Sequence, residues 1–79
     1  MDKRVYNAVK EGRSDHNIDY ADFCNLILDL GFEYVRQRGS HKMYYHFGVK
    51  AFANAQPKGN KAKPYQVKQL RDMINLHNL

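Results

Sequence analysis

The chain has one cysteine, no tryptophan and two prolines among its 79 residues. A single cysteine excludes an internal disulfide framework, and it also argues against a zinc site built on several thiolates. Cys24 falls within an apolar helical pattern, which predicts that it packs as a small hydrophobic side chain. No signal-peptide core follows Met1, and no apolar run approaches the ~20 residues that span a bilayer. We therefore expect a cytoplasmic protein with no membrane contact.

Acidic residues are missing from the middle of the chain. Between Tyr34 and Arg71 there are nine Lys or Arg residues and no Asp or Glu, whereas the first 33 residues hold seven acids and four bases. Charge of one sign repels itself in a folded protein and usually persists because an anion binds it. With a net charge of +5, the first candidate for that anion is a nucleic-acid phosphate backbone.

Three stretches have the apolar spacing of helices. The spacing predicts a short helix over residues 3–11, a second helix that follows the N-cap Asp19 and ends at Gly31, and a last helix that begins at Pro64. The apolar stripes are Val5, Ala8 and Val9 in the first, Phe23, Leu26, Ile27 and Leu30 in the second, and Val67, Leu70 and Ile74 in the third.

Between the last two helices the pattern changes to that of strands. Aromatic and β-branched residues favour strands over 32–38, 41–47 and 49–55, separated by turns at Gly39-Ser40 and Gly48. These predict an α+β fold in the order α-α-β-β-β-α, with the helices on one face of a three-stranded antiparallel sheet. We divide the chain into an N-terminal helix and connector (1–17) and a main domain (18–79) that form one compact unit.

His41 follows the Gly39-Ser40 turn inside the basic stretch and is the candidate catalytic residue. In RNA, the 2′-hydroxyl attacks the adjacent phosphate when a base removes its proton, and a histidine imidazole suits that task because it titrates near neutral pH. Arg36, Arg38 and Lys42 supply cations for the phosphate. The basic stretch has no carboxylates to hold an ion, so we expect no metal and no cofactor. Residues 56–63, with Pro57 and Gly59, are predicted to form a loop. The predicted phosphate track continues through the loop residues Lys58, Lys61 and Lys63 and then through Lys68 and Arg71.

Other readings of the same residues stay open at this point. A lone histidine after a turn is commonly a surface residue without a special role, and apolar residues on both parities of its strand leave its face undecided. If His41 has no special role, the chain is a module that binds duplex RNA by its shape without cutting it. Alternatively, it is a domain whose basic face binds an acidic protein.

Several short segments, in order and spacing, resemble the HicA toxins of bacterial toxin–antitoxin pairs. They are Leu30-Gly31-Phe32, Arg38-Gly39-Ser40-His41, Met43-Tyr44 and the run from Gly59 to Val67. The similarity extends from about Ile18 to the C-terminus. The residues at 12–15 and 54–57 resemble a longer branch of that family with an N-terminal extension.

The resemblance implies a fold like the double-stranded RNA-binding domain, with a helix, a three-stranded sheet and a helix. It implies an mRNA-cleaving toxin ribonuclease that acts without the ribosome and is neutralised by a HicB-type antitoxin covering the catalytic histidine. The family's histidine corresponds to His41, and Gly39 and Ser40 correspond to the turn before it, which we include among the RNA-binding residues.

Overall fold

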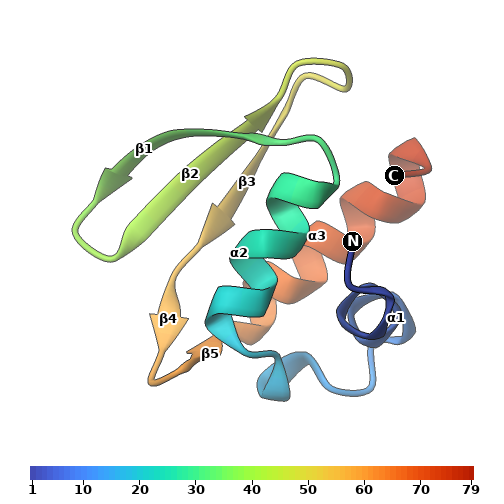
Figure 1. Cartoon of the computed structure of the whole chain (residues 1–79), viewed down its shortest axis with the longest axis vertical. Helices are drawn as coiled ribbons and strands as arrows, with labels where there is room; N and C mark the ends of the chain where they lie inside the picture. The colour runs from blue at the N-terminus through green and yellow to red at the C-terminus, as the bar shows by residue number, and fades with distance from the viewer.

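Three α-helices and a three-stranded antiparallel sheet make up the fold (Figure 1). The computed structural model describes residues 1–79. The elements are α1 (Lys3–Glu11), a 3₁₀ turn η1 (Asp15–Asn17), α2 (Tyr20–Asp29), β1 (Glu33–Arg38), β2 (His41–His46), β3 (Ala51–Ala55), the short strands β4 (Pro57–Lys58) and β5 (Lys61–Ala62), and α3 (Pro64–His77). The predicted α+β fold in the order α-α-β-β-β-α is confirmed.

Helix α2 has clear sequence signals at both ends. The Asp19 carboxylate accepts a hydrogen bond from the Asp22 N–H at 3.0 Å and caps the helix N-terminus. At the other end, Gly31 adopts a left-handed φ of 101°, and the Phe32 N–H donates to the Ile27 carbonyl. This is the geometry of a Schellman cap. It turns the chain from α2 into β1 and buries Phe32.

The sheet has the order β1-β2-β3, and only one of its faces is covered. Tyr44 on β2 pairs with Ala53 on β3, and both are buried against the helices. Because successive side chains alternate between faces, His41, Met43 and Tyr45 point the other way. We call the face of the sheet away from the helices the outer face. Figure 1 shows the three helices gathered on the opposite side.

A bulge in β1 shifts the pairing between Tyr34 and Arg36. It places Arg36 opposite Met43 and Arg38 opposite His41, while Tyr34 stays opposite the buried Tyr44. Directly opposed residues in an antiparallel pair share a face, so both arginines lie on the outer face with His41.

The core forms between the inner face of the sheet and the helices. All four predicted stripe residues of α2 are buried, as are Val5 and Val9 of α1 and Val67, Leu70 and Ile74 of α3. Cys24 is also buried among them, as its position in the pattern predicts. Helix α1 is therefore a structural part of the core and not an appendage to it.

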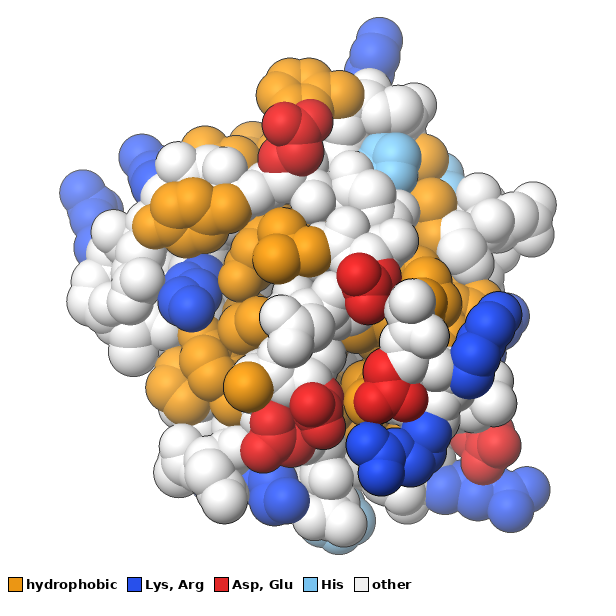
Figure 2. Space-filling view, viewed as in Figure 1, with side chains coloured by type: hydrophobic (Ala, Val, Ile, Leu, Met, Phe, Trp, Pro, Cys, Tyr) orange, Lys and Arg blue, Asp and Glu red, His pale blue; other side chains and the backbone are white.

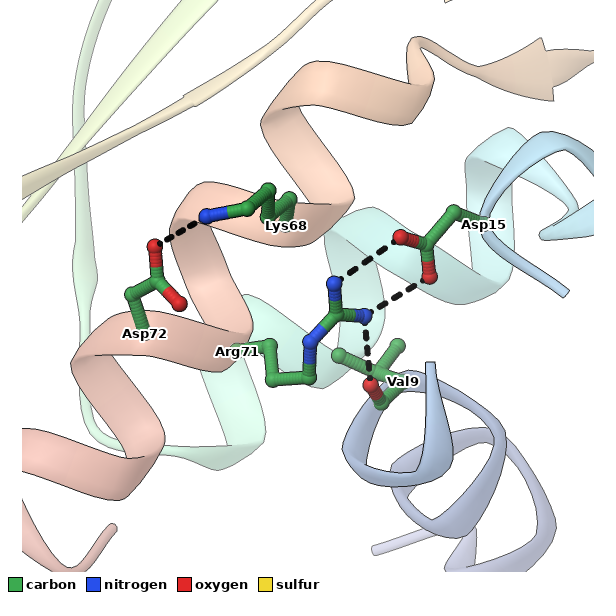
Figure 3. A network of polar contacts seen from close by, with 5 residues as sticks. All are labelled: Val9, Asp15, Lys68, Arg71 and Asp72. Carbon is green, nitrogen blue, oxygen red and sulfur yellow. Dashed lines mark hydrogen bonds and ion pairs between the residues drawn. The ribbon is translucent and has the colours of Figure 1, made fainter. Parts of the chain in front are cut away.

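Polar contacts also attach the N-terminal segment to α3 (Figure 3). The Arg71 guanidinium forms two hydrogen bonds with the Asp15 carboxylate, at 2.7 and 3.0 Å, and a third with the Val9 carbonyl at 3.1 Å. Nearby, the Lys10 ammonium donates to the Asn75 side chain, and the Tyr6 hydroxyl donates to the Leu79 carbonyl. The two segments that we separated at residue 17 thus share one core and one polar network.

His46, at the end of β2, ties the following turn to the sheet. Its Nδ1 accepts hydrogen bonds from the N–H groups of Gly48 and Val49, at 3.1 and 3.2 Å. Its ring packs edge-to-face on Phe32 with the centroids 5.0 Å apart. Nδ1 acts as an acceptor here, so Nε2 carries the ring proton in the neutral imidazole.

Replacing His46 by alanine should lower the free energy of unfolding by about 1–3 kcal/mol, because two backbone donors and an aromatic contact lose their partner. His46→Asn should recover part of this loss, since its side-chain oxygen accepts the same bonds. Urea unfolding measures both variants against His16→Ala, an exposed histidine. A loss no larger than that of the control would contradict this role.

Three features differ from the sequence-based expectations. Strand β1 begins at Glu33 because Phe32 belongs to the cap. Strand β2 ends at His46, and β3 begins at Ala51, because residues 47–50 form the turn. The predicted loop between Gln56 and Lys63 contains the two-residue strands β4 and β5, which pair as a small hairpin. As a separate observation, none of the helices is both long enough and apolar enough to cross a bilayer.

Candidate active site

His41 is the first residue of β2 and lies half-buried on the outer face. The Gly39-Ser40 turn fixes its position, because it joins the paired residues Arg38 and His41 through two residues only. Gly39 has a φ of 58° and Ser40 has no positive φ, which is the pattern of a type II′ turn, the kind that suits the twist of a hairpin. The imidazole is therefore held by a short, regular hairpin.

Asn54, on β3, contacts the His41 ring directly. Its Oδ1 lies 2.9 Å from His41 Nε2. With the amide oxygen as acceptor, Nε2 carries the ring proton and the lone pair is on Nδ1, which has no partner within the chain. The contact orients the imidazole and leaves one ring nitrogen free to accept a proton.

Two arginines lie beside this pair on β1. Arg38 is directly opposite His41, and Arg36 is opposite Met43, where its Nε donates to the Met43 sulfur at 3.5 Å. Both side chains are exposed, and neither forms an ion pair with a carboxylate. Their guanidinium groups are free to bind an anion next to the imidazole, and arginine suits phosphate because it forms two parallel hydrogen bonds.

Lys42 does not join this group. It alternates with His41 and so points to the inner face, where its ammonium lies 5.7 Å from the centre of the Tyr20 ring. The expectation that Lys42 acts beside His41 on the same phosphate is corrected by this geometry. Lys42 remains a cation at the edge of the site, on the other side of the strand.

The predicted lysine loop is ordered as the β4–β5 hairpin. Lys58 and Lys61 are paired across it, with Gly59 in the turn, and Lys63 follows as the N-cap residue of α3. Gln56 lies between β3 and β4 in the chain, and its N–H donates to the Gln66 side chain of α3 at 2.7 Å. The hairpin thus continues from the sheet end at which His41 lies (Figure 1).

The last two residues of the predicted track lie on α3 and are paired (Figure 3). Lys68 is exposed and forms an ion pair with Asp72 at 3.0 Å. The Arg71 side chain is only 16% exposed, and hydrogen bonding to Asp15 raises the pKa of its guanidinium. The structure therefore corrects the placement of Arg71 in the phosphate track: its donors are used to hold the N-terminal segment.

The tyrosines of the sheet divide between its faces. Burial, followed by hydrogen bonding with Cys24, raises the pKa of the Tyr44 hydroxyl above its usual range and the pKa of Tyr20 to about 12. Both phenols keep their protons at neutral pH. Tyr44 is 3% exposed and belongs to the core, and Tyr34 packs against it edge-on. Tyr45 alone of the β2 tyrosines lies on the outer face.

Charge is unevenly spread over the surface. Figure 2 shows acidic side chains spread over the face that bears α2, most of them in its middle and lower part, with Lys and Arg side chains among them and around the edges. No three histidine, cysteine, aspartate or glutamate side chains lie close enough together to hold a metal ion. Asp2, Asp22 and Asp29 line one hollow beside α2. These carboxylates make that part of the surface unsuited to a polyanion, in contrast to the strand end with Arg36 and Arg38.

A comparison with protein families decides the family. The model described as the HicA toxin of bacterial toxin–antitoxin matches residues 20–76, which include α2, the sheet and nearly all of α3. The chain belongs to the HicA toxin family. No curated protein and no solved structure matches it. Membership implies a toxin–antitoxin ribonuclease, with RNA as its substrate and an antitoxin as its partner.

The HicA match begins after α1 and η1, so it covers His41, Asn54, both outer-face arginines and the lysine hairpin. Sequence reasoning missed Asn54. One asparagine within a strand gives no periodic signal, and its contact with His41 depends on the β2–β3 register. The only clue is that an amide is uncommon in the middle of a strand.

Replacing Asn54 by leucine should lower the maximal rate of RNA cleavage about tenfold or more with little change in KM, because the ring loses its orienting partner but the phosphate ligands remain. Single-turnover kinetics at saturating enzyme measures this rate. Asn60→Leu, an exposed asparagine in the β4–β5 turn, is the matched control. Equal rates for Asn54→Leu and wild type would show that the contact has no role in positioning.

Proposed function

We propose that this HicA-family chain is an mRNA endoribonuclease that uses His41 as its general acid or base. The observation that supports this most directly is the arrangement on the outer face: an imidazole oriented by Asn54, with Arg38 directly opposite it. The face is open, so a phosphodiester can approach without rearrangement of the fold.

The chemistry begins with transfer of the 2′-hydroxyl proton to the free His41 nitrogen. The 2′-oxygen attacks the adjacent phosphorus, and the bond to the 5′-oxygen breaks as that oxygen takes up a proton from water. Arg36 and Arg38 stabilise the negative charge that develops on the phosphorane oxygens. The products are a 2′,3′-cyclic phosphate and a 5′-hydroxyl end. An RNA without the 2′-hydroxyl is not cut.

We propose that cleavage requires no metal ion. The support is chemical: the attacking hydroxyl belongs to the substrate, and one imidazole with two guanidinium groups supplies the proton transfer and the charge stabilisation. Cleavage of labelled RNA should therefore continue in EDTA. RNA that shifts on a gel but stays intact would instead favour a non-catalytic RNA-binding module.

We propose a HicB-type antitoxin as the partner that neutralises the toxin by covering His41. The support is that the outer face is not covered by any element of the chain itself, so a partner can reach the imidazole directly. Cleavage should stop when the cognate antitoxin is added in equal amount, and Arg38 should become protected from chemical modification.

The lysine hairpin is proposed as the part of the site that holds the RNA backbone. For the double variant Lys58→Gln, Lys61→Gln, the slope of log affinity against log salt concentration should fall by about 0.7 for each lost contact with single-stranded RNA. Lys3→Gln with Lys50→Gln removes two lysines outside the track and should leave the slope unchanged. Equal slopes in the two double variants would argue against this track.

A further inference from the structure

The outer face carries an apolar patch that the proposed chemistry does not use. It consists of Val35 from the β1 bulge, Tyr45 from β2, Phe47 from the following turn and Phe52 from β3, which together line a shallow hollow. Val35, Phe47 and Phe52 are 48%, 65% and 52% exposed. Side chains of this size normally add to the core of so small a domain, so a patch with this exposure is typical of a binding surface.

The three rings of the patch form a connected surface. The centroid of Tyr45 lies 4.8 Å from that of Phe47 and 4.7 Å from that of Phe52. Tyr45 and Phe52 are directly paired across β2 and β3. Because paired strands hold both residues, the rings keep their positions without a ligand, and binding costs little ordering entropy.

The patch lies on the same face as the candidate catalytic group. Tyr45 is four residues beyond His41 on β2 and on the same parity, which places the two side chains about 13 Å apart along the strand. Phe52 is likewise two residues from Asn54 on β3. An RNA strand that binds along β2, starting from the β1–β2 turn, passes His41 first and then reaches the rings.

Charge along this face separates two kinds of contact. Arg36 and Arg38 lie at the His41 end, whereas Glu33 is opposite Tyr45 at the other end. The arginine end suits a phosphate. The ring end, with an acid beside it, suits the uncharged bases.

We infer that Tyr45, Phe47 and Phe52 form a stacking platform for an unpaired base of the RNA strand whose phosphate lies at His41. This rests on the proposed ribonuclease function and adds to it the kind of RNA that is bound. Only a base that is not already stacked in a duplex can place its face on these rings. The site therefore takes single-stranded RNA and reads it by stacking near the scissile phosphate.

Binding of short single-stranded RNA to the full chain carrying His41→Ala tests the platform. Phe52→Leu keeps an apolar side chain but removes the ring, so it should weaken binding about tenfold. An abasic oligonucleotide of the same length and charge should bind both forms equally. Phe52→Trp should bind the RNA at least as tightly as Phe52 does.

Tyr34→Leu is the matched control, because Tyr34 is 54% exposed but lies on the inner face. Tyr45→Leu provides a second test if Phe52→Leu lowers the thermal unfolding temperature. If Phe52→Leu weakens the binding of RNA and of the abasic oligonucleotide equally, or weakens neither, the stacking platform is refuted. If Phe52→Leu weakens only the binding of the antitoxin, the stacking platform is also refuted, and the patch is a protein-binding surface instead. If the wild-type chain cuts RNA in any of these cases, the proposed function stands; if it neither binds nor cuts RNA, both fail.

Discussion

Replacing His41 by alanine is expected to reduce RNA cleavage by about 10²–10⁴-fold, the usual contribution of a positioned acid or base. The fold should be unaffected, because the side chain lies half-buried on the outer face and its only hydrogen-bond partner is Asn54. Binding of intact RNA should persist, since Arg36, Arg38 and the lysine hairpin are unchanged. Cleavage rates and circular dichroism of the same preparation measure both effects.

His16→Ala and His77→Ala are suitable controls for this loss. They lie in η1 and at the end of α3, away from the outer face. Growth arrest on expression in bacteria provides a second measurement, which the control variants should retain and His41→Ala should lose. Wild-type arrest or cleavage by His41→Ala would refute the assignment.

Removing residues 1–17 is expected to produce the largest loss of stability. The deletion takes away Val5 and Val9, each worth about 1.5–3 kcal/mol when fully buried, and it leaves the Arg71 guanidinium without its three hydrogen bonds. Domains of this kind have only about 5–15 kcal/mol of stability in all. We expect the thermal midpoint to fall by about 20 °C or more.

This deletion separates the structural role of α1 from the chemistry. The HicA match starts at residue 20, so the remaining chain retains every candidate site residue. Asn7→Ala and Lys3→Ala change exposed positions on α1 and should leave the midpoint within a few degrees. A chain of residues 18–79 with an unchanged midpoint would show that α1 is dispensable for folding.

Elements with strong local signals could be predicted from the sequence. Helix α2 has an apolar face at the required spacing, an aspartate N-cap and a glycine C-cap, and all three features are found in the structure. The β1–β2 hairpin followed from Gly39-Ser40. In each case the residues that determine the element lie within it or directly at its ends, so the local sequence contains the whole signal.

The face occupied by His41 could not be predicted in this way. Strand β2 has aromatic residues on both parities, with Tyr44 buried and Tyr45 on the outer face. Period-two alternation assigns faces only when one parity is clearly more apolar. Tyr45, whose ring obscures the pattern of β2, is one of the residues that we propose for base stacking.

The roles of Arg71 and Lys42 depended on contacts between distant segments. Arg71 pairs with Asp15, 56 residues away in the chain, and no local pattern reveals such a partner. Lys42 is next to His41 in the sequence but across the strand from it. The sequence does contain a basic stretch, but the fold places its lysines and arginines in different surroundings: in an ion pair, on the inner face of the sheet and on its outer face.

The end groups of cut RNA test the central claim most directly. Wild-type protein in EDTA should yield fragments with 2′,3′-cyclic phosphate and 5′-hydroxyl ends, and His41→Ala should yield none above background. Fragments with 5′-phosphate ends, or cleavage that disappears with EDTA and returns with a divalent cation, would contradict removal of the 2′-hydroxyl proton by His41 as the basis of strand scission.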